Sequence, residues 1–190
     1  MLFQQSDQLK GLPTAARLSS ALDLIEKCWE LDKRVNAFYE GLASYCAGPL
    51  YWPVFTKPED DLGGDLFTMS MHFPDLRVAS VMMLYWTILT MLWCGMSELY
   101  FVVSELGDVS ELPALGERKN WIAMAHNVCQ SASYCLQSEM VSMGAMMVAV
   151  PLQVVLVYLK SYPECRGEYL WTLKLLEKLK MEGMRGLEFE

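Results

Sequence analysis

Residues able to do acid–base chemistry are few in this chain, whose two histidines are His72 and His126. A general base works beside a nucleophile and an orienting carboxylate, and the sequence has no G-x-S-x-G elbow, no glycine-rich phosphate loop and no H-E-x-x-H. The adjacent carboxylates Asp60 and Asp61 lie in a polar stretch, where nothing tunes a pKa for acid–base work. We therefore predict no catalytic residue and no enzymatic activity. His72 is expected at a loop-to-helix junction, and His126 as a packing residue.

The cysteines allow either three disulfides or six free thiols. They are Cys28, Cys46, Cys94, Cys129, Cys135 and Cys165. Because the chain is apolar enough to build its own core and begins without an apolar secretory segment, we expect reduced, buried thiols and an intracellular protein. A zinc site needs convergent ligands, but on a helix Cys135 would lie about 180° from His126 and about 120° from Cys129. We predict no metal site and no cofactor.

Charge and composition exclude two further classes of protein. The 190 residues include 15 Lys and Arg against 23 Asp and Glu, a net charge of −8, and 53% are apolar. Such a chain is too apolar to be a disordered tail. An acidic chain without a Lys/Arg cluster also lacks the counterion release that holds proteins on nucleic acid, so no autonomous nucleic-acid binding is expected.

Helical periodicity dominates, and no strand-like alternation is visible, so the predicted fold is all-α, a single-domain helical bundle. An amphipathic helix is expected from Leu18 to Leu42. Its apolar stripe is Leu18, Leu22, Ile25, Trp29, Val35, Phe38 and Leu42. Prolines and glycines between Gly48 and Gly64 then predict a loop, held to the body by aromatic side chains. These are Tyr51, Trp52 and Phe55.

Further helices are expected over residues 78–106, 117–140, 140–159 and 164–181. Asp75, after Pro74, is the predicted N-cap of the first of these. Gly183 and Gly186 are expected to end the last one. Its predicted core positions are Leu170, Leu173, Leu176 and Leu179. The predicted organisation is a flexible N-terminus at 1–13, a helical domain at 14–182 and a C-terminal tail at 183–190.

Two uncharged runs, Val78–Ser97 and Met140–Leu159, are each long enough to cross a bilayer as a helix. Aromatic residues such as Trp86 sit inside the first run, whereas membrane helices concentrate them at the interfaces. The second run has Gln153 near Pro151, a costly pair in lipid. These details favour two central, buried helices of a soluble bundle. The alternative is a small integral membrane protein with two transmembrane helices.

Methionine is abundant, with 14 residues, many of them in these two runs. The plainest interpretation is core filling, because the flexible thioether adapts to irregular gaps. Methionine-rich surfaces also form adaptable grooves for apolar ligands or partner helices. A second alternative is therefore a binder of, or an enzyme acting on, an apolar secondary metabolite.

Three stretches, in this order, carry a family resemblance. They are Leu50-Tyr51-Trp52-Pro53, then Phe73-Pro74-Asp75-Leu76-Arg77 leading into Met83-Leu84-Tyr85-Trp86, and then Ser133-Tyr134-Cys135-Leu136-Gln137 followed by Val150-Pro151-Leu152. Together they resemble the C-terminal helical regulatory region of fungal zinc-cluster (Zn2Cys6-type) transcription factors. The resemblance covers roughly residues 20–180. The chain departs from the family in lacking the six-cysteine zinc cluster and the basic segment of the DNA-binding module.

The resemblance implies a non-enzymatic regulatory or interaction domain, nuclear or cytoplasmic, of the kind often linked to a secondary-metabolite gene cluster. In the family this region serves regulation, dimerisation or effector sensing. The partners it implies are another protein or a second copy of the chain, and an apolar small-molecule effector. The motif residues expected in buried contacts are Pro74, Asp75, Tyr85, Trp86, Tyr134, Cys135 and Pro151. Val150 and Leu152 are expected in the same contacts.

Overall fold

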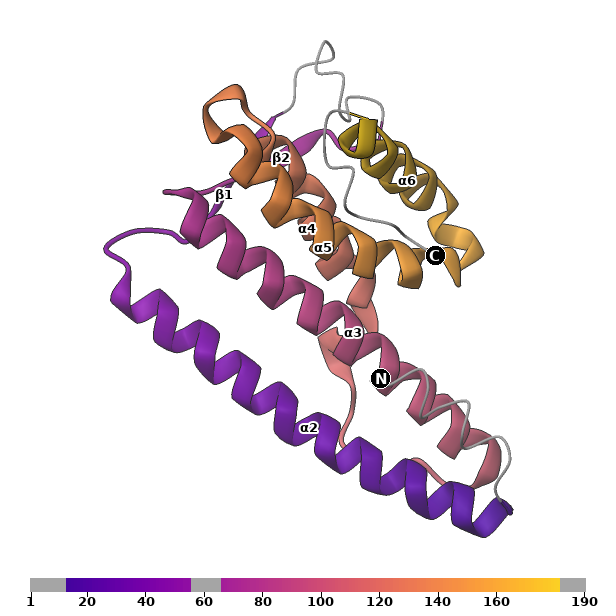
Figure 1. The fold of residues 1–190 in the computed structure, drawn as a ribbon. Coiled ribbons are helices and arrows are strands. Elements are labelled where there is room, and N and C mark those ends of the chain that lie inside the picture. Colours follow the sequence, from indigo (N-terminus) through magenta and orange to yellow (C-terminus); the bar gives the residue numbers. More distant parts are fainter. Residues whose placement is uncertain (1–12, 56–65, 182–190) are drawn as a thin grey trace. The chain divides into compact units, whose positions relative to one another are not determined.

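The computed structural model describes residues 13–55 and 66–181, and this part of the chain contains five α-helices and two short strands (Figure 1). The prediction of an all-α fold is confirmed. The chain divides into two compact units. Of the described residues, unit 1 comprises those up to Tyr45 together with Ile88–Ile122, and unit 2 comprises those within Cys46–Thr87 and from Ala123 onward. The predicted N-terminal and C-terminal tails, Asp60, Asp61, Gly183 and Gly186 lie outside the described residues, apart from Pro13 at the end of the first tail.

Unit 1 is built on the long helix α2, Thr14–Tyr45. Its fully buried positions, Ala21, Ile25, Cys28 and Asp32, recur every three or four residues and therefore share one face. This face is rotated from the predicted stripe, in which Leu22 and Phe38 were expected to be buried. At 100° per residue Phe38 lies roughly 110° around the helix from the centre of the buried face, and it is 56% exposed.

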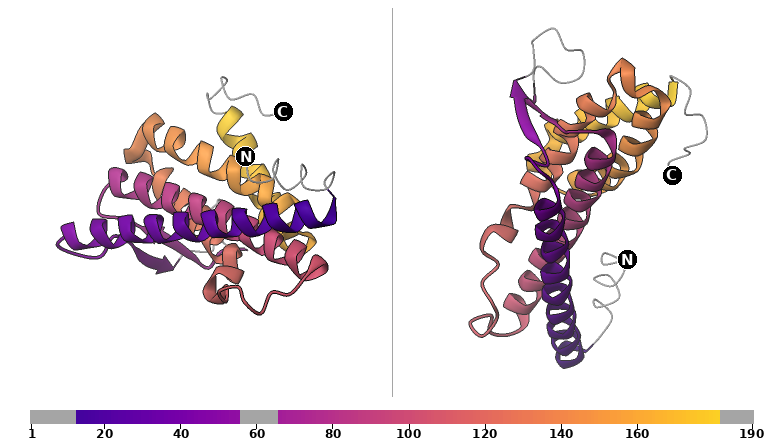
Figure 2. Two further views of the ribbon diagram at one scale, coloured as in Figure 1. Left: turned by 90° about the horizontal axis from the view of Figure 1, so that it is seen from below. Right: turned by 90° about the vertical axis from the view of Figure 1, so that its left-hand side faces the viewer.

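Helix α3, Leu76–Leu106, starts in unit 2, and its residues from Ile88 onward belong to unit 1. Asp75 is its N-cap, as predicted, and accepts a hydrogen bond from the backbone N–H of Val78 at 2.9 Å. The unit 1 part of α3 runs antiparallel to α2, because Trp29 contacts Tyr100 while Asp32 contacts Trp93. Two views show this part of α3 alongside α2 (Figures 1 and 2).

A connection after α3 completes unit 1. It leads into a short 3₁₀ helix, η1, Gly116–Asn120, whose first residue has a φ of 56°. Such a backbone conformation is open to glycine at little steric cost. Leu115 and Trp121, on either side of η1, are buried and fix this connection to the unit.

Unit 2 contains a two-stranded antiparallel sheet that the sequence did not predict. Strand β1, Trp52–Phe55, pairs with β2, Met69–His72, and Trp52 lies opposite His72 in the register. Each strand has four residues, too few to produce a visible alternation. The expectation that three aromatic residues hold this segment to the body was correct for Tyr51, whose ring contacts Trp86. It was wrong for Trp52 and Phe55, which are exposed.

Three helices complete unit 2: α4, Trp121–Cys135, α5, Val141–Lys160, and α6, Arg166–Met181. The first two residues of α4 belong to unit 1. The 3₁₀ helices η2, Ser138–Met140, and η3, Pro163–Cys165, connect the three helices. Helix α4 ends earlier than predicted. A Cβ at Gly144 of α5 would lie 1.8 Å from the Cys135 carbonyl oxygen, so this glycine is what allows α5 to start against the end of α4.

Most of the motif residues predicted in buried contacts are inside unit 2. Trp86, Tyr134, Cys135 and Pro151 are buried, and Asp75 and Tyr85 are half-buried. Pro74 is exposed, and its predicted burial was wrong, because Phe73 beside it takes the inward position and contacts Tyr134. Val150 and Leu170 were also expected inside and are exposed, whereas Leu152 is buried.

Two helical segments in the described residues are long and apolar enough to cross a membrane, Leu76–Leu106 and Met143–Lys160. In the most apolar part of each segment, 61% of the first is buried inside the protein and 44% of the second is buried. The core helix of a soluble protein passes the same test of length and composition. The second segment presents apolar side chains outward on one helix face. They are Met143, Met146, Val150 and Val157.

Candidate functional site

The two histidines lie in unit 2 and contact aromatic rings. The His72 ring meets Tyr134 edge-on with centroids 5.4 Å apart, and burial lowers the pKa of His72. His126 Nε2 lies 3.0 Å from Oε1 of Glu168, and its ring contacts Phe67. His126 is therefore half-buried and partnered, as predicted for a packing residue, with a carboxylate partner that the sequence did not indicate.

The cysteines carry free thiols, and burial makes several of them poor nucleophiles. The pKa of Cys129 is raised to about 12 by burial, although its Sγ lies 3.5 Å from the Thr172 hydroxyl. Burial also raises the pKa of Cys135 to about 12 and those of Cys28 and Cys165 to about 11. Because the thiolate is the reactive form, these four side chains are unsuited to nucleophilic attack at neutral pH.

No group of three or more His, Cys, Asp or Glu side chains in residues 13–55 and 66–181 is placed to hold a metal ion. His126 and Cys129 contact two different residues of α6, Glu168 and Thr172, one turn apart. These contacts pack α4 against α6 inside unit 2. They do not bring the two side chains to a common point.

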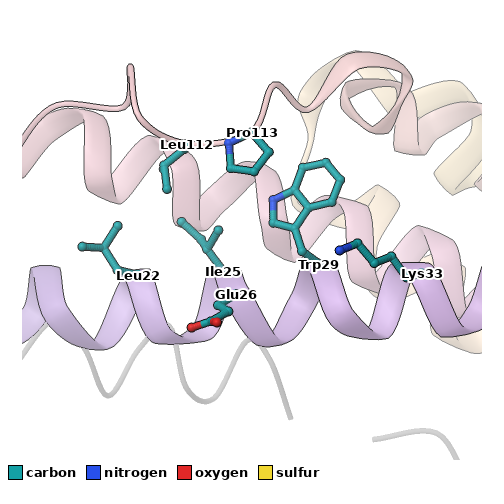
Figure 3. A pocket seen from close by; sticks show the side chains of 7 residues that line it. All are labelled: Leu22, Ile25, Glu26, Trp29, Lys33, Leu112 and Pro113. Atoms are coloured by element: carbon teal, nitrogen blue, oxygen red, sulfur yellow. The ribbon is translucent and has the colours of Figure 1, made fainter.

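The strongest candidate site is an open cavity of about 410 Å³ in unit 1 (Figure 3). Its lining residues are Leu22, Ile25, Glu26, Trp29, Lys33, Leu112 and Pro113. Five of them come from α2, at helix positions i, i+3, i+4, i+7 and i+11, and two come from the connection after α3. Pockets for small ligands typically have this size and this mostly apolar lining with a few polar groups.

A buried carboxylate lies on α2 one turn from the cavity residue Trp29. Asp32 has no exposed surface, and Oδ1 accepts a hydrogen bond from Trp93 Nε1 at 2.7 Å. Its Oδ2 accepts two from Arg118, at 2.9 Å from Nε and 2.5 Å from the terminal nitrogen. A buried charge is tolerated when it is paired and hydrogen-bonded in this way. Asp32 therefore ties α2 to both α3 and η1.

The same cluster holds Trp29 at the cavity wall. The guanidinium carbon of Arg118 lies 4.5 Å from the centroid of the Trp29 ring, a cation–π contact. Trp29 Nε1 donates to the Tyr100 hydroxyl at 2.9 Å, and that hydroxyl donates to the Pro113 carbonyl at 2.7 Å. Tyr100 thus fixes both Trp29, the largest side chain of the wall, and Pro113 on the opposite side of the cavity. A site held by such contacts is shaped before a ligand enters.

Sequence reasoning missed this site. Trp29 was expected on the buried stripe of α2, but it is half-buried and lines the cavity. Asp32 was not singled out, although a signal existed: it falls on the same helix face as Ala21, Ile25 and Cys28. A carboxylate in phase with buried apolar residues predicts a buried partner.

Comparisons with protein-family models, with curated protein sequences and with solved structures find no match to this chain. A function is therefore inferred from the geometry of the cavity and the residues around it.

Proposed function

We propose that this chain is a non-enzymatic, predominantly helical regulatory domain in which the unit 1 cavity binds a small apolar effector. The cavity of about 410 Å³ between α2 and the Leu112–Pro113 segment carries the proposal. Its lining is mostly hydrocarbon and indole, so burial of an apolar ligand there would be favourable at roughly 25 cal/mol per Å² of apolar surface.

The chemistry of the lining supports binding rather than turnover. The seven side chains include no thiol, hydroxyl or imidazole, and the two charged groups, Glu26 and Lys33, stand two helical turns apart on α2. General acid–base catalysis needs proton-transfer groups within hydrogen-bond reach of one reacting atom. A mostly apolar wall of this kind suits recognition of a ligand's shape.

A role in transcriptional regulation rests on the resemblance to the regulatory region of fungal zinc-cluster factors. In such a domain an effector in unit 1 would shift the equilibrium between conformations that a protein partner distinguishes. Its place would be the nucleus or cytoplasm, and its targets would include a secondary-metabolite gene cluster. Deleting the gene and profiling the transcripts of adjacent genes tests this role. Unchanged transcripts under conditions that produce the metabolite would contradict it.

Binding in the cavity is tested with the neutral fluorophore N-phenyl-1-naphthylamine. Leu22 lines the cavity and is 38% exposed, so Leu22→Trp adds bulk at the cavity without opening the core. Leu31→Trp is the matched control, because Leu31 lies on α2 with similar exposure and does not line the cavity. We expect saturable binding that weakens about tenfold in Leu22→Trp and is unchanged in Leu31→Trp. Equal binding in both variants, or none in the native chain, would contradict the proposal.

A second candidate function is an integral membrane protein with two spanning helices. The outward apolar face of α5, with Met146 61% exposed and Val157 59% exposed, favours it over a helix buried on all sides. Fractionation separates the two candidates. A protein that stays with membranes through a carbonate wash and needs detergent for release is membrane-spanning, whereas one found in the soluble fraction is not.

A further inference from the structure

The two charged side chains of the cavity differ in direction. The ammonium group of Lys33 points toward Trp29 along the cavity, whereas the carboxylate of Glu26 points away from Leu112 and Pro113 (Figure 3). The ion pairs formed among residues 13–55 and 66–181 do not include Lys33. Lys33 thus presents a positive charge that forms no ion pair with a carboxylate of the described residues.

The other cation near the cavity is already neutralised. Arg118 lies over the ring of Trp29, and both of its hydrogen bonds to Asp32 go to a carboxylate with no exposed surface. The Asp32–Arg118 pair therefore adds little net charge to the part of the cavity beside Trp29. The charge that a ligand would meet beside Trp29 is that of Lys33.

From this asymmetry we propose that the ligand is a small apolar organic acid, with its hydrocarbon or aromatic body on the apolar wall and its anionic group at the Lys33 ammonium. The inference rests on the proposed function and adds the chemical class of the effector. A cavity of about 410 Å³ is at the lower end of ligand-site volumes, so it suits one compact molecule rather than a two-chain lipid. An amine is disfavoured, because the Glu26 carboxylate that would receive it points outward.

Two matched fluorophores test the class of ligand. 1-Anilinonaphthalene-8-sulfonate carries an anionic group on the same ring system as neutral N-phenyl-1-naphthylamine. We expect Lys33→Gln to weaken binding of the sulfonate about fivefold to tenfold and to leave binding of the neutral probe unchanged. Lys27→Gln is the control, because Lys27 is on the same helix, pairs with Asp23 and does not line the cavity. It should change neither probe.

The outcomes separate the two proposals. If Lys33→Gln binds both probes like the native chain while Leu22→Trp weakens both, the cavity binds apolar ligands and the organic-acid inference is overturned. If Leu22→Trp changes neither probe, the proposed function itself fails. Competition against the neutral probe extends the test from a sulfonate to a carboxylate. We expect 1-naphthoate to displace the neutral probe more strongly than 1-naphthylmethanol does, and equal displacement by the two compounds would contradict the inference. Circular dichroism of each variant confirms that the helices are intact.

Discussion

The indole N–H of Trp93 donates to the carboxylate of Asp32 across 2.7 Å, where Asp32 has no contact with solvent. Because Arg118 donates to the other oxygen of the same carboxylate, one buried charge joins three segments of unit 1 that are distant in the sequence. The cavity depends on these segments, since Trp29 and Pro113 are held by their neighbours. The stability of this cluster is therefore a condition for the ligand binding that we propose.

Asp32→Ala should destabilise the protein by about 3 kcal/mol, because it leaves the Trp93 N–H unpaired in the core and removes the partner of Arg118. Asp32→Asn should cost less, since the amide oxygen still accepts from Trp93. Urea unfolding followed by circular dichroism measures both. Asp23→Ala removes an exposed carboxylate paired with Lys27 and should change the free energy of unfolding little. A similar loss in both alanine variants would contradict the account of Asp32.

Tyr100→Phe should weaken binding of N-phenyl-1-naphthylamine without occupying the cavity. The tyrosine hydroxyl accepts from Trp29 and donates to Pro113, so its removal releases both walls at once. We expect the dissociation constant to rise several-fold, in keeping with the loss of hydrogen bonds worth about 1 kcal/mol each. Faster amide hydrogen exchange at residues 108–115 should accompany the loss. Unchanged affinity and exchange would show that the tyrosine does not position the site.

Trp86→Ala should destabilise the protein by about 3–5 kcal/mol, as truncations of large buried side chains do. Trp86 is 2% exposed, and its ring contacts Tyr51 at 5.0 Å and Phe73 at 6.1 Å between centroids. The matched control is Trp52→Ala, because Trp52 is 39% exposed. Thermal or chemical unfolding measures both variants. Full stability after Trp86→Ala would contradict its buried position.

Gly144→Ala and Gly41→Ala should change stability in opposite directions. A Cβ at position 144 would collide with the Cys135 carbonyl, so Gly144→Ala must shift the start of α5 and should cost about 1–3 kcal/mol or more. A Cβ at position 41, inside α2, meets nothing within 4 Å, so Gly41→Ala should stabilise the helix by about 0.5–1 kcal/mol. Melting temperatures decide the question. A neutral Gly144→Ala would show that α4 and α5 do not approach closely.

Alkaline pH should destabilise the protein. The thiols of Cys129 and Cys135 keep their protons up to a pKa of about 12 in the folded chain and release them nearer their ordinary value when unfolded. Between those values the folded state binds more protons, so the free energy of unfolding falls as pH rises above about 9. Urea unfolding at pH 8 and pH 10 measures the difference. Cys129→Ala should reduce this pH dependence, and an unchanged dependence would contradict the burial of its thiol.

The sequence predicts where the helices of this protein lie better than it predicts which face of each helix is buried. The start of α3 follows from the Asp75 cap and its end from Gly107, which comes directly after Leu106. The bounds of α5 follow from its uncharged run, and all of these are local signals. The pairing of β1 with β2 and the close approach of Gly144 to Cys135 bring together segments that meet only in the folded chain. Periodicity in the sequence predicts single helices and strands, and it does not show which segments meet.

The site was harder to predict than the fold for the same reason. Asp32, Tyr100 and Arg118 are ordinary polar residues in the sequence. The contacts of Asp32 with Trp93 and Arg118 join residues that are 61 and 86 positions apart. The role of Tyr100 depends on its hydrogen bond to the Pro113 carbonyl. Motif searches look for catalytic or metal-binding spacings, whereas an apolar ligand site has no fixed spacing. The one local signal was a carboxylate in phase with the buried face of α2.

The central claim is that a small apolar ligand binds beside Trp29, and the indole N–H resonances of the six tryptophans test it most directly. A ¹H–¹⁵N titration with 1-anilinonaphthalene-8-sulfonate would follow all six, with the Trp29 peak assigned through Trp29→Phe. Because Trp29 lines the cavity while Trp171 packs against Phe67 in unit 2, we predict a saturable shift of the Trp29 peak and a fixed Trp171 peak. A Trp29 peak that does not move while the probe binds elsewhere would contradict the account.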